Sequence, residues 1–171
     1  PNANTALEYG GEIDNTFSSG SYYNGNQHLI FDASTDLVIK SAVFYAEDPK
    51  TITFELRSSN GTVIDDTTHN VIQGQQQLSL KFEVPMGAGM ELGIANGGSS
   101  LYRNDDDAIY PYDIGSIMSI TGNSADPDYY YFYYDIEVEA VCTGIVNPIY
   151  GCTDPTACNY DSTATVDDGS C

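Results

Sequence analysis

Apolar and polar side chains alternate one by one through several segments of this chain. In TITFELR, at 51–57, every second residue is apolar: Ile52, Phe54 and Leu56. The segment QLSLKFEV, at 77–84, repeats the pattern with leucine, phenylalanine and valine. Successive side chains of a β-strand point to opposite faces, so a period of two places one face on a core and the other in water. The alternation therefore predicts a sheet protein with buried inner faces.

Further segments with strand character lie between turns rich in Gly, Asn, Asp and Pro, and no segment keeps a helical period. We expect these additional strands at 28–33, 37–46, 62–72, 90–94, 114–121 and 129–141, with a short one at 100–103. Eight or nine short strands separated by such turns are typical of two packed antiparallel sheets. The predicted fold class is all-β: an antiparallel, jelly-roll-like β-sandwich with a small disulfide-stapled C-terminal tail.

The chain has room for one domain of ordinary size and a small appendage. We expect four parts: an N-terminal extended segment at 1–26, the β-sandwich domain at 27–141, a linker at 142–150 and a cysteine-rich acidic module at 151–171. The first part has apolar residues to bury and no obvious strand of its own. It has neither a basic start nor an apolar stretch, so we expect a mature or excised segment of a secreted protein.

The charge balance is strongly acidic. The sequence has 25 Asp and Glu against 5 Lys and Arg, a formal net charge of -20, and its cations are scattered: Lys40, Lys50, Arg57, Lys81 and Arg103. Nucleic acids and anionic lipid surfaces bind basic patches, so neither is expected as a partner. No segment reaches the apolar length that membrane insertion needs. Because an excess of carboxylates repels itself unless cations neutralise it, a bound metal ion is a reasonable expectation.

Cysteine placement favours disulfides over a zinc site. Three of the 4 cysteines fall between Gly151 and Cys171, whereas both histidines, His28 and His69, lie far upstream. Such a tail without histidine fits a disulfide framework. Disulfides persist in oxidising compartments, so we expect an extracellular or cell-surface location. All four thiols are expected to be oxidised within the chain: Cys142, Cys152, Cys158 and Cys171.

The segment DYYYFYYDIEVEA is the most unusual predicted strand. Continuous alternation places Tyr130, Phe132 and Tyr134 on the inner face and leaves three tyrosines outside: Tyr129, Tyr131 and Tyr133. Outer tyrosines at alternate positions form a rigid strip suited to stacking on sugar rings or on another protein. The alternative is that a neighbouring segment, such as residues 1–26, covers them.

A second candidate ligand site lies in LYRNDDDAIYPYDIG. Its three adjacent carboxylates, flanked by tyrosines, predict a loop that binds Ca²⁺ or a polyol: Asp105, Asp106 and Asp107. The alternative is a solvated acidic loop. The chain contains no GxSxG, no HExxH and no glycine-rich phosphate loop, so we do not expect an enzyme.

The last segment, GCTDPTACNYDSTATVDDGSC, carries oxygen-bearing side chains between turn-forming residues. A disulfide-closed loop of this kind would fold five of them around Ca²⁺: Asp154, Asn159, Asp161, Asp167 and Asp168. Their spacing differs from that of an EF-hand. The alternative is a disulfide-stapled acidic knot without a metal ion.

Along its whole length this last segment resembles the module Gly-Cys-Thr-Asp … Ala-x-Asn-Tyr … Ala-Thr-x-Asp-Asp-Gly-Ser-Cys. That module recurs in large secreted and cell-surface proteins of Bacteroidetes exported by the type IX secretion system. Through ITFELRSSNGTVIDDTT, LYRN, AIYPYDIG and YYYFYYDIEVE, residues 27–139 resemble a β-domain of such proteins, with Ile136 where a Trp is expected. The resemblance implies an extracellular, multidomain and repetitive setting.

The resemblance also implies a disulfide pairing. Similar modules keep the cysteines at the positions of Cys152 and Cys171 and often lack the one at Cys158. This implies a Cys152–Cys171 bridge and leaves Cys142 to pair with Cys158.

Covalent modification is implied by the same resemblance. Proteins of this group carry O-linked glycans at Asp-Ser/Thr-x motifs. Two such motifs occur here, Asp66-Thr67-Thr68 and Asp161-Ser162-Thr163, with Thr67 and Ser162 as the expected acceptors.

Two functions are compatible with these features, and a third, an enzyme, would need a catalytic acid pair that the sequence does not identify. The first is an extracellular structural or adhesive module, one unit of a cell-surface fibre or large repetitive adhesin, whose partners are other copies of itself or neighbouring modules. The alternative is a carbohydrate-binding module that presents its surface tyrosines and acidic loop to a polysaccharide. We favour the first, because nothing in the sequence demands a small-molecule pocket.

Overall fold

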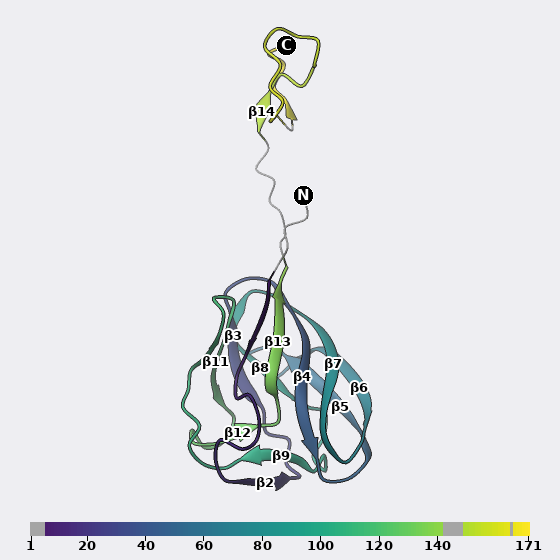
Figure 1. The fold of residues 1–171 in the computed structure, drawn as a ribbon, viewed down its shortest axis with the longest axis vertical. Helices are drawn as coiled ribbons and strands as arrows, with labels where there is room; N and C mark the ends of the chain where they lie inside the picture. Colours follow the sequence, from purple (N-terminus) through teal and green to yellow (C-terminus); the bar gives the residue numbers. More distant parts are fainter. Residues whose placement is uncertain (1–5, 142–148, 165) are drawn as a thin grey trace.

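The structure is a computed structural model that describes residues 6–141, 149–164 and 166–171. The regular secondary structure of these residues consists of β-strands, and no helix occurs among them. The described residues therefore contain no helix long and apolar enough to cross a membrane. Two sheets with antiparallel strand pairing pack against each other (Figure 1). This confirms the predicted antiparallel β-sandwich.

The two sheets divide the strands unevenly. The seven-stranded sheet contains β1 (Leu7–Gly10), β2 (Gly20–Tyr23), β4 (Leu37–Ala46), β7 (Gly74–Val84), β9 (Leu101–Asn104), β12 (Tyr130–Tyr131) and β13 (Tyr134–Ala140). The six-stranded sheet has the order β10 (Tyr112–Ile114), β11 (Met118–Asn123), β3 (Leu29–Ala33), β8 (Gly87–Ile94), β5 (Lys50–Arg57) and β6 (Val63–Val71). A separate pair in the tail joins β14 (Tyr150–Gly151) to β15 (Val166–Asp167).

The core forms where the alternating strands face one another. Phe44 on β4 and Phe54 on β5 are both fully buried, and their ring centroids lie 4.4 Å apart across the two sheets. Neighbouring strands add paired apolar residues, as where Leu29 lies opposite Leu92. The inner residues of TITFELR are all buried, as their spacing predicts.

A bulge interrupts the longest strand pairing. Strand β4 pairs with β7 over most of its length, but the register shifts between Ile39 and Ser41. Opposite this shift, Lys81 has a φ of 59°, a left-handed conformation that is uncommon for a residue with a side chain. The extra residue in β7 bends the strand and lets its alternation continue on both sides of the bulge.

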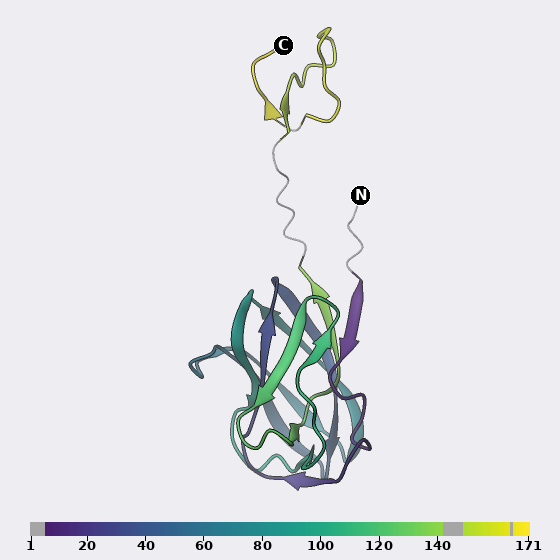
Figure 2. The same ribbon diagram turned by 90° about the vertical axis from the view of Figure 1, so that its left-hand side faces the viewer.

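The N-terminal residues belong to the sandwich. Strand β1 pairs with β13, Leu7 lying opposite Glu139, and β2 pairs with β9 (Figure 2). The approach of β2 to β9 requires glycine at position 20, because a Cβ there would lie 2.2 Å from the Arg103 carbonyl oxygen. The segment at 1–26, expected to be extended without a strand of its own, therefore supplies two strands, and the first and last strands of the sandwich lie side by side.

The tail is closed by one disulfide. Cys152 and Cys171 are bonded, which confirms the pairing implied by the resemblance. Strands β14 and β15 run parallel, with Tyr150 opposite Val166. The tail thus begins before Gly151, inside the predicted linker 142–150, most of which lies outside the described residues.

Candidate functional site

The predicted tyrosine face on the aromatic strand is wrong. Alternation stops at Phe132, whose φ of 66° turns the backbone between β12 and β13. As a result, all five consecutive aromatic residues from Tyr130 to Tyr134 are fully buried or nearly so. The Tyr133 hydroxyl donates to the Gly93 carbonyl oxygen, and burial raises its pKa well above the ordinary range. Of the three tyrosines predicted to be outside, only Tyr129 is partly exposed.

Tyr129 and Tyr131 instead surround a cation. The Arg103 guanidinium lies 4.5 Å from the ring centroid of Tyr23, 4.4 Å from that of Tyr129 and 5.8 Å from that of Tyr131. Its Nη1 donates to the Tyr131 hydroxyl at 3.3 Å, and its side chain is only 15% exposed. Cation–π contacts of this kind stabilise the packing of β2, β9 and the loop before β12. The alternative prediction, that residues 1–26 cover the tyrosines of this strand, is thus correct for Tyr131, against which Tyr23 packs.

The acidic loop is tied to the N-terminal segment. Asp105 accepts a hydrogen bond from the Ser19 hydroxyl at 3.0 Å, and its amide donates to the Ser19 carbonyl oxygen. A carboxylate oxygen of Asp106 accepts a hydrogen bond from the amide of Asp107, whose φ is 62°. These contacts order the loop without bringing its three carboxylates into one ligand set, and its predicted ligand remains a prediction.

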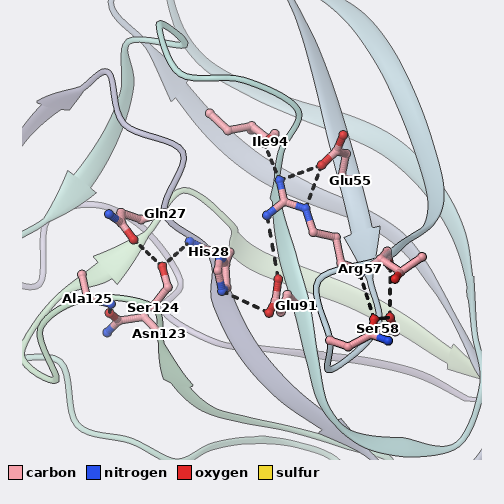
Figure 3. Close-up of polar contacts among 12 residues, drawn as sticks. Gln27, His28, Glu55, Arg57, Ser58, Glu91, Ile94, Asn123, Ser124 and Ala125 are labelled. Atoms are coloured by element: carbon pink, nitrogen blue, oxygen red, sulfur yellow. Dashed lines mark hydrogen bonds and ion pairs between the residues drawn. The ribbon is translucent and has the colours of Figure 1, made fainter.

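A half-buried polar network lies on the outer face of the six-stranded sheet (Figure 3). Arg57 donates to Glu55 through Nε at 2.7 Å and through Nη2 at 2.6 Å, and its Nη1 lies 3.8 Å from Glu91. Glu91 also lies 3.4 Å from His28 Nε2. All four side chains are less than one fifth exposed, with exposed fractions between 12% and 19%. No pattern in the sequence indicates this network, because its members come from β5, β8 and the residue before β3.

The network makes stability depend on pH through His28. Burial lowers the pKa of His28 from its usual 6.5, with Arg57 adding to the effect and Glu91 opposing it. Because the His28 pKa is lower in the folded chain than in the unfolded one, folding favours the neutral imidazole. The contribution of neutral His28 to the free energy of unfolding is therefore complete above pH 6.5, and it is lost as pH falls from 6.5 through the lowered pKa. We expect the urea midpoint to fall less between pH 7.5 and about pH 5 in His28→Gln than in the wild type. His69→Gln serves as the control, and an equal fall in His28→Gln and the wild type would contradict this assignment.

The tail carboxylates are used in local turns. One oxygen of Asp154 accepts from the amide and hydroxyl of Thr156, and Asp161 repeats this arrangement with Thr163. Hydrogen bonds from these residues lower the pKa of both carboxyls. In the following turn, Asp167 accepts a hydrogen bond from the Gly169 amide and Asp168 accepts one from the Ser170 amide. The Asn159 side-chain amide donates to the Ser170 carbonyl oxygen at 2.7 Å.

These turns do not gather the carboxylates around one point. Across 6–141, 149–164 and 166–171, no group of three or more His, Cys, Asp or Glu is placed to hold a metal ion. The five expected ligands of the tail therefore do not form a ready-made metal site from side chains. Calcium binding remains a prediction of the sequence.

The tail has almost no core. Within its described residues, Cys152 alone is fully buried. Its large apolar side chains are exposed: Ile149 at 47%, Tyr150 at 64%, Tyr160 at 45% and Val166 at 39%. Tyr150 and Val166 lie opposite each other in β14 and β15, and Tyr160 bridges to Cys152. We call these four residues the apolar face of the tail.

The remaining covalent predictions are not settled by these contacts. Within the described residues Cys158 is exposed and has no bonded partner, and Cys142 lies outside them, so their bridge remains a prediction. Ser162 is exposed, as a glycan acceptor must be. Thr67 lies on β6 and is half-buried beside His69. Glycosylation of both residues remains a prediction.

Comparison with known proteins gives little further guidance. No family model and no curated protein matches the chain. Among solved structures, an active-site mutant of a family two carbohydrate esterase from Clostridium thermocellum is similar, with a TM-score of 0.32 and 12% identity. The match covers 77% of this chain and 34% of that one, so this chain spans about a third of its length. Likeness at this level carries no argument about function.

Proposed function

We propose that this chain is an extracellular structural or adhesive module in which the β-sandwich is the rigid body and the tail is the joining element. The tail docks its apolar face onto the sandwich of another copy. The observation that carries this proposal is the tail itself, a disulfide-closed unit whose large apolar side chains are exposed rather than packed. Exposed apolar residues gathered on a small element mark interaction surfaces.

The sandwich, unlike a second tail, offers cations to an acidic tail that docks on it. The described tail carries four aspartates and no lysine or arginine, so two tails repel each other. All five cations belong to the sandwich, including Lys40 and Lys50, whose side chains are partly exposed and paired with Glu139 and Asp48. A contact between two different surfaces of one chain is heterologous, and repetition of such a contact builds rings or filaments. This is the behaviour expected of one unit of a fibre.

The proposal predicts concentration-dependent association of the full chain. Sedimentation velocity at raised ionic strength, where repulsion between acidic copies is screened, should show larger species as protein concentration increases. We expect the double variant Tyr150→Ser/Val166→Ser to associate at least roughly thirtyfold more weakly, because truncating an aromatic anchor costs about 2 kcal/mol or more.

The control for this experiment is Thr153→Ala, which changes an exposed tail residue outside the apolar face. It should associate like the wild type. A wild-type chain that stays monomeric throughout, or a double variant that associates as strongly as the control, would refute the joining role of the tail.

A further inference from the structure

An open hollow of about 600 Å³ lies at one end of the six-stranded sheet. Its walls come from three neighbouring places: the end of β3, the turn between β7 and β8, and the β10–β11 hairpin. The space exists because small residues line it, including Gly87, Ala88 and Gly115. Its volume is within the range of small-molecule sites in proteins.

Three polar side chains form one row across the hollow. Asp113 on β10 lies opposite Ser119 on β11, and Ser119 lies opposite Asp32 on β3. Their chain neighbours Phe31, Met118 and Ile114 are buried in the core, so the row faces outward. Adjacent strands are about 4.8 Å apart, so the two carboxylates flank a space roughly two strands wide.

Each of the two carboxylates accepts a hydrogen bond from the protein through one of its oxygens. Asp32 Oδ1 accepts from the Gly89 amide at 2.8 Å, and Asp113 Oδ1 accepts from the Ser119 hydroxyl at 2.6 Å. The second oxygen of each carboxylate has no hydrogen-bond partner within the described part of the chain. Two fixed carboxylates therefore present open acceptors at the hollow.

The rim is fixed as well. Ser34 donates from its hydroxyl to the Ser116 carbonyl oxygen at 2.7 Å and from its amide to the Ile117 carbonyl oxygen at 2.9 Å, which secures the β10–β11 turn. The Met86 amide donates to Asp36, while the Met86 side chain remains 67% exposed at the edge. The site is thus pre-organised, with an apolar group beside its polar row.

We propose that this hollow binds a neutral sugar unit of a glycan. Carboxylate oxygens accept hydrogen bonds from hydroxyl groups, and the apolar edge at Met86 suits the C–H face of a sugar ring. An anionic ligand is disfavoured by the two carboxylates and by the net charge of -20. This site lies on the sandwich and is independent of the joining role of the tail.

Two further hollows within the described residues are weaker candidates. One of about 130 Å³, beside the loop that follows β8, is too small for a sugar ring. Another of about 360 Å³ lies between the start of β4 and the end of β7, and Val141 forms part of its wall. It borders residues outside the described ranges, so its full shape is not defined.

The test is a glycan array probed with the full chain, followed by calorimetry with the neutral oligosaccharide that binds best. We expect Asp32→Asn and Asp113→Asn each to weaken binding roughly tenfold, because a hydrogen bond to a charged group is replaced by a neutral one. Asp66→Asn, an exposed aspartate on β6 at the far side of the same sheet, should bind like the wild type.

A steric variant tests the same site without changing charge. Ala88 lines the hollow and is exposed, so a larger side chain is accepted there. Ala88→Leu should fill the hollow and abolish sugar binding while leaving the unfolding midpoint within a small range of the wild type. Absence of neutral glycan binding, preference for acidic glycans, or unchanged affinity in all three site variants would overturn the assignment. Sedimentation of these variants should match the wild type, so failure here leaves the tail proposal intact.

Discussion

Replacing Tyr133 by alanine is expected to reduce the free energy of unfolding of the sandwich by about 3 to 5 kcal/mol. The Tyr133 ring is fully buried and lies 4.9 Å from the ring of Phe44 and 6.1 Å from that of Phe54. Truncation leaves a cavity between the sheets and removes the donor that satisfies the Gly93 carbonyl oxygen. Both effects act in the same direction.

Urea unfolding followed by far-UV circular dichroism measures this loss. The matched control is Tyr22→Ala, since Tyr22 is 42% exposed and contacts Tyr102 edge-on at 5.4 Å. The control should cost about 1 kcal/mol or less. Equal losses for the two variants would mean that Tyr133 lies on an outer face, as uninterrupted alternation predicts.

Reducing the Cys152–Cys171 disulfide is expected to unfold the tail and leave the sandwich unchanged. The bridge closes a loop with a sequence separation of 19 and contributes about 3 kcal/mol in the chain-entropy model. Few other contacts order the tail, because its parallel strand pair has two residues on each strand and Cys152 alone is fully buried in its described part. A unit this small without a core depends on its covalent bridge.

Backbone amide NMR spectra of the full chain, recorded before and after reduction, separate the two parts. Signals of 149–171 should collapse to random-coil positions, and signals of the sandwich should stay in place. Cys158→Ser should leave both sets unchanged, because Cys158 has no disulfide partner within the described part of the chain. Tail signals that remain dispersed after reduction would show that the local Asp turns suffice to order it.

The fold could be predicted because its signal is local. Alternating residues in β5 and β7 must face a core whatever their partners are, so β5 is predicted to within one residue and β7 to within three. The prediction for the aromatic strand was wrong because Phe132 has a left-handed backbone conformation, which changes which side chains face inward. No pattern in YYYFYY marks that position.

Strands that depend on distant partners were missed. Residues 7–10 form β1 only because β13 offers an open edge more than a hundred residues later in the chain. The same holds for β2 and its close approach to β9 through Gly20. Short pairings of this kind are stabilised by backbone hydrogen bonds, which leave little trace in side-chain pattern.

The candidate sites also differ in whether their contacts join residues that are close or distant in the sequence. The turns of Asp154 and Asp161 join residues two positions apart, so the repeated Asp-x-Thr spacing predicts them locally. The apolar face of the tail brings together Tyr150 and Val166, and the hollow brings together Asp32 and Asp113, through strand registers that the sequence does not specify. Only the structure reveals these two surfaces.

The central claim, that the tail joins one copy to the sandwich of another, is tested most directly by cross-linking. The full chain with benzoylphenylalanine in place of Tyr150 is mixed with isotopically labelled wild-type chain, irradiated and analysed by peptide mass spectrometry. We predict cross-links from position 150 to labelled peptides of the sandwich, which place the tail of one molecule on the body of another. Cross-links confined to unlabelled peptides of the same chain, or to other tails, would contradict the claim.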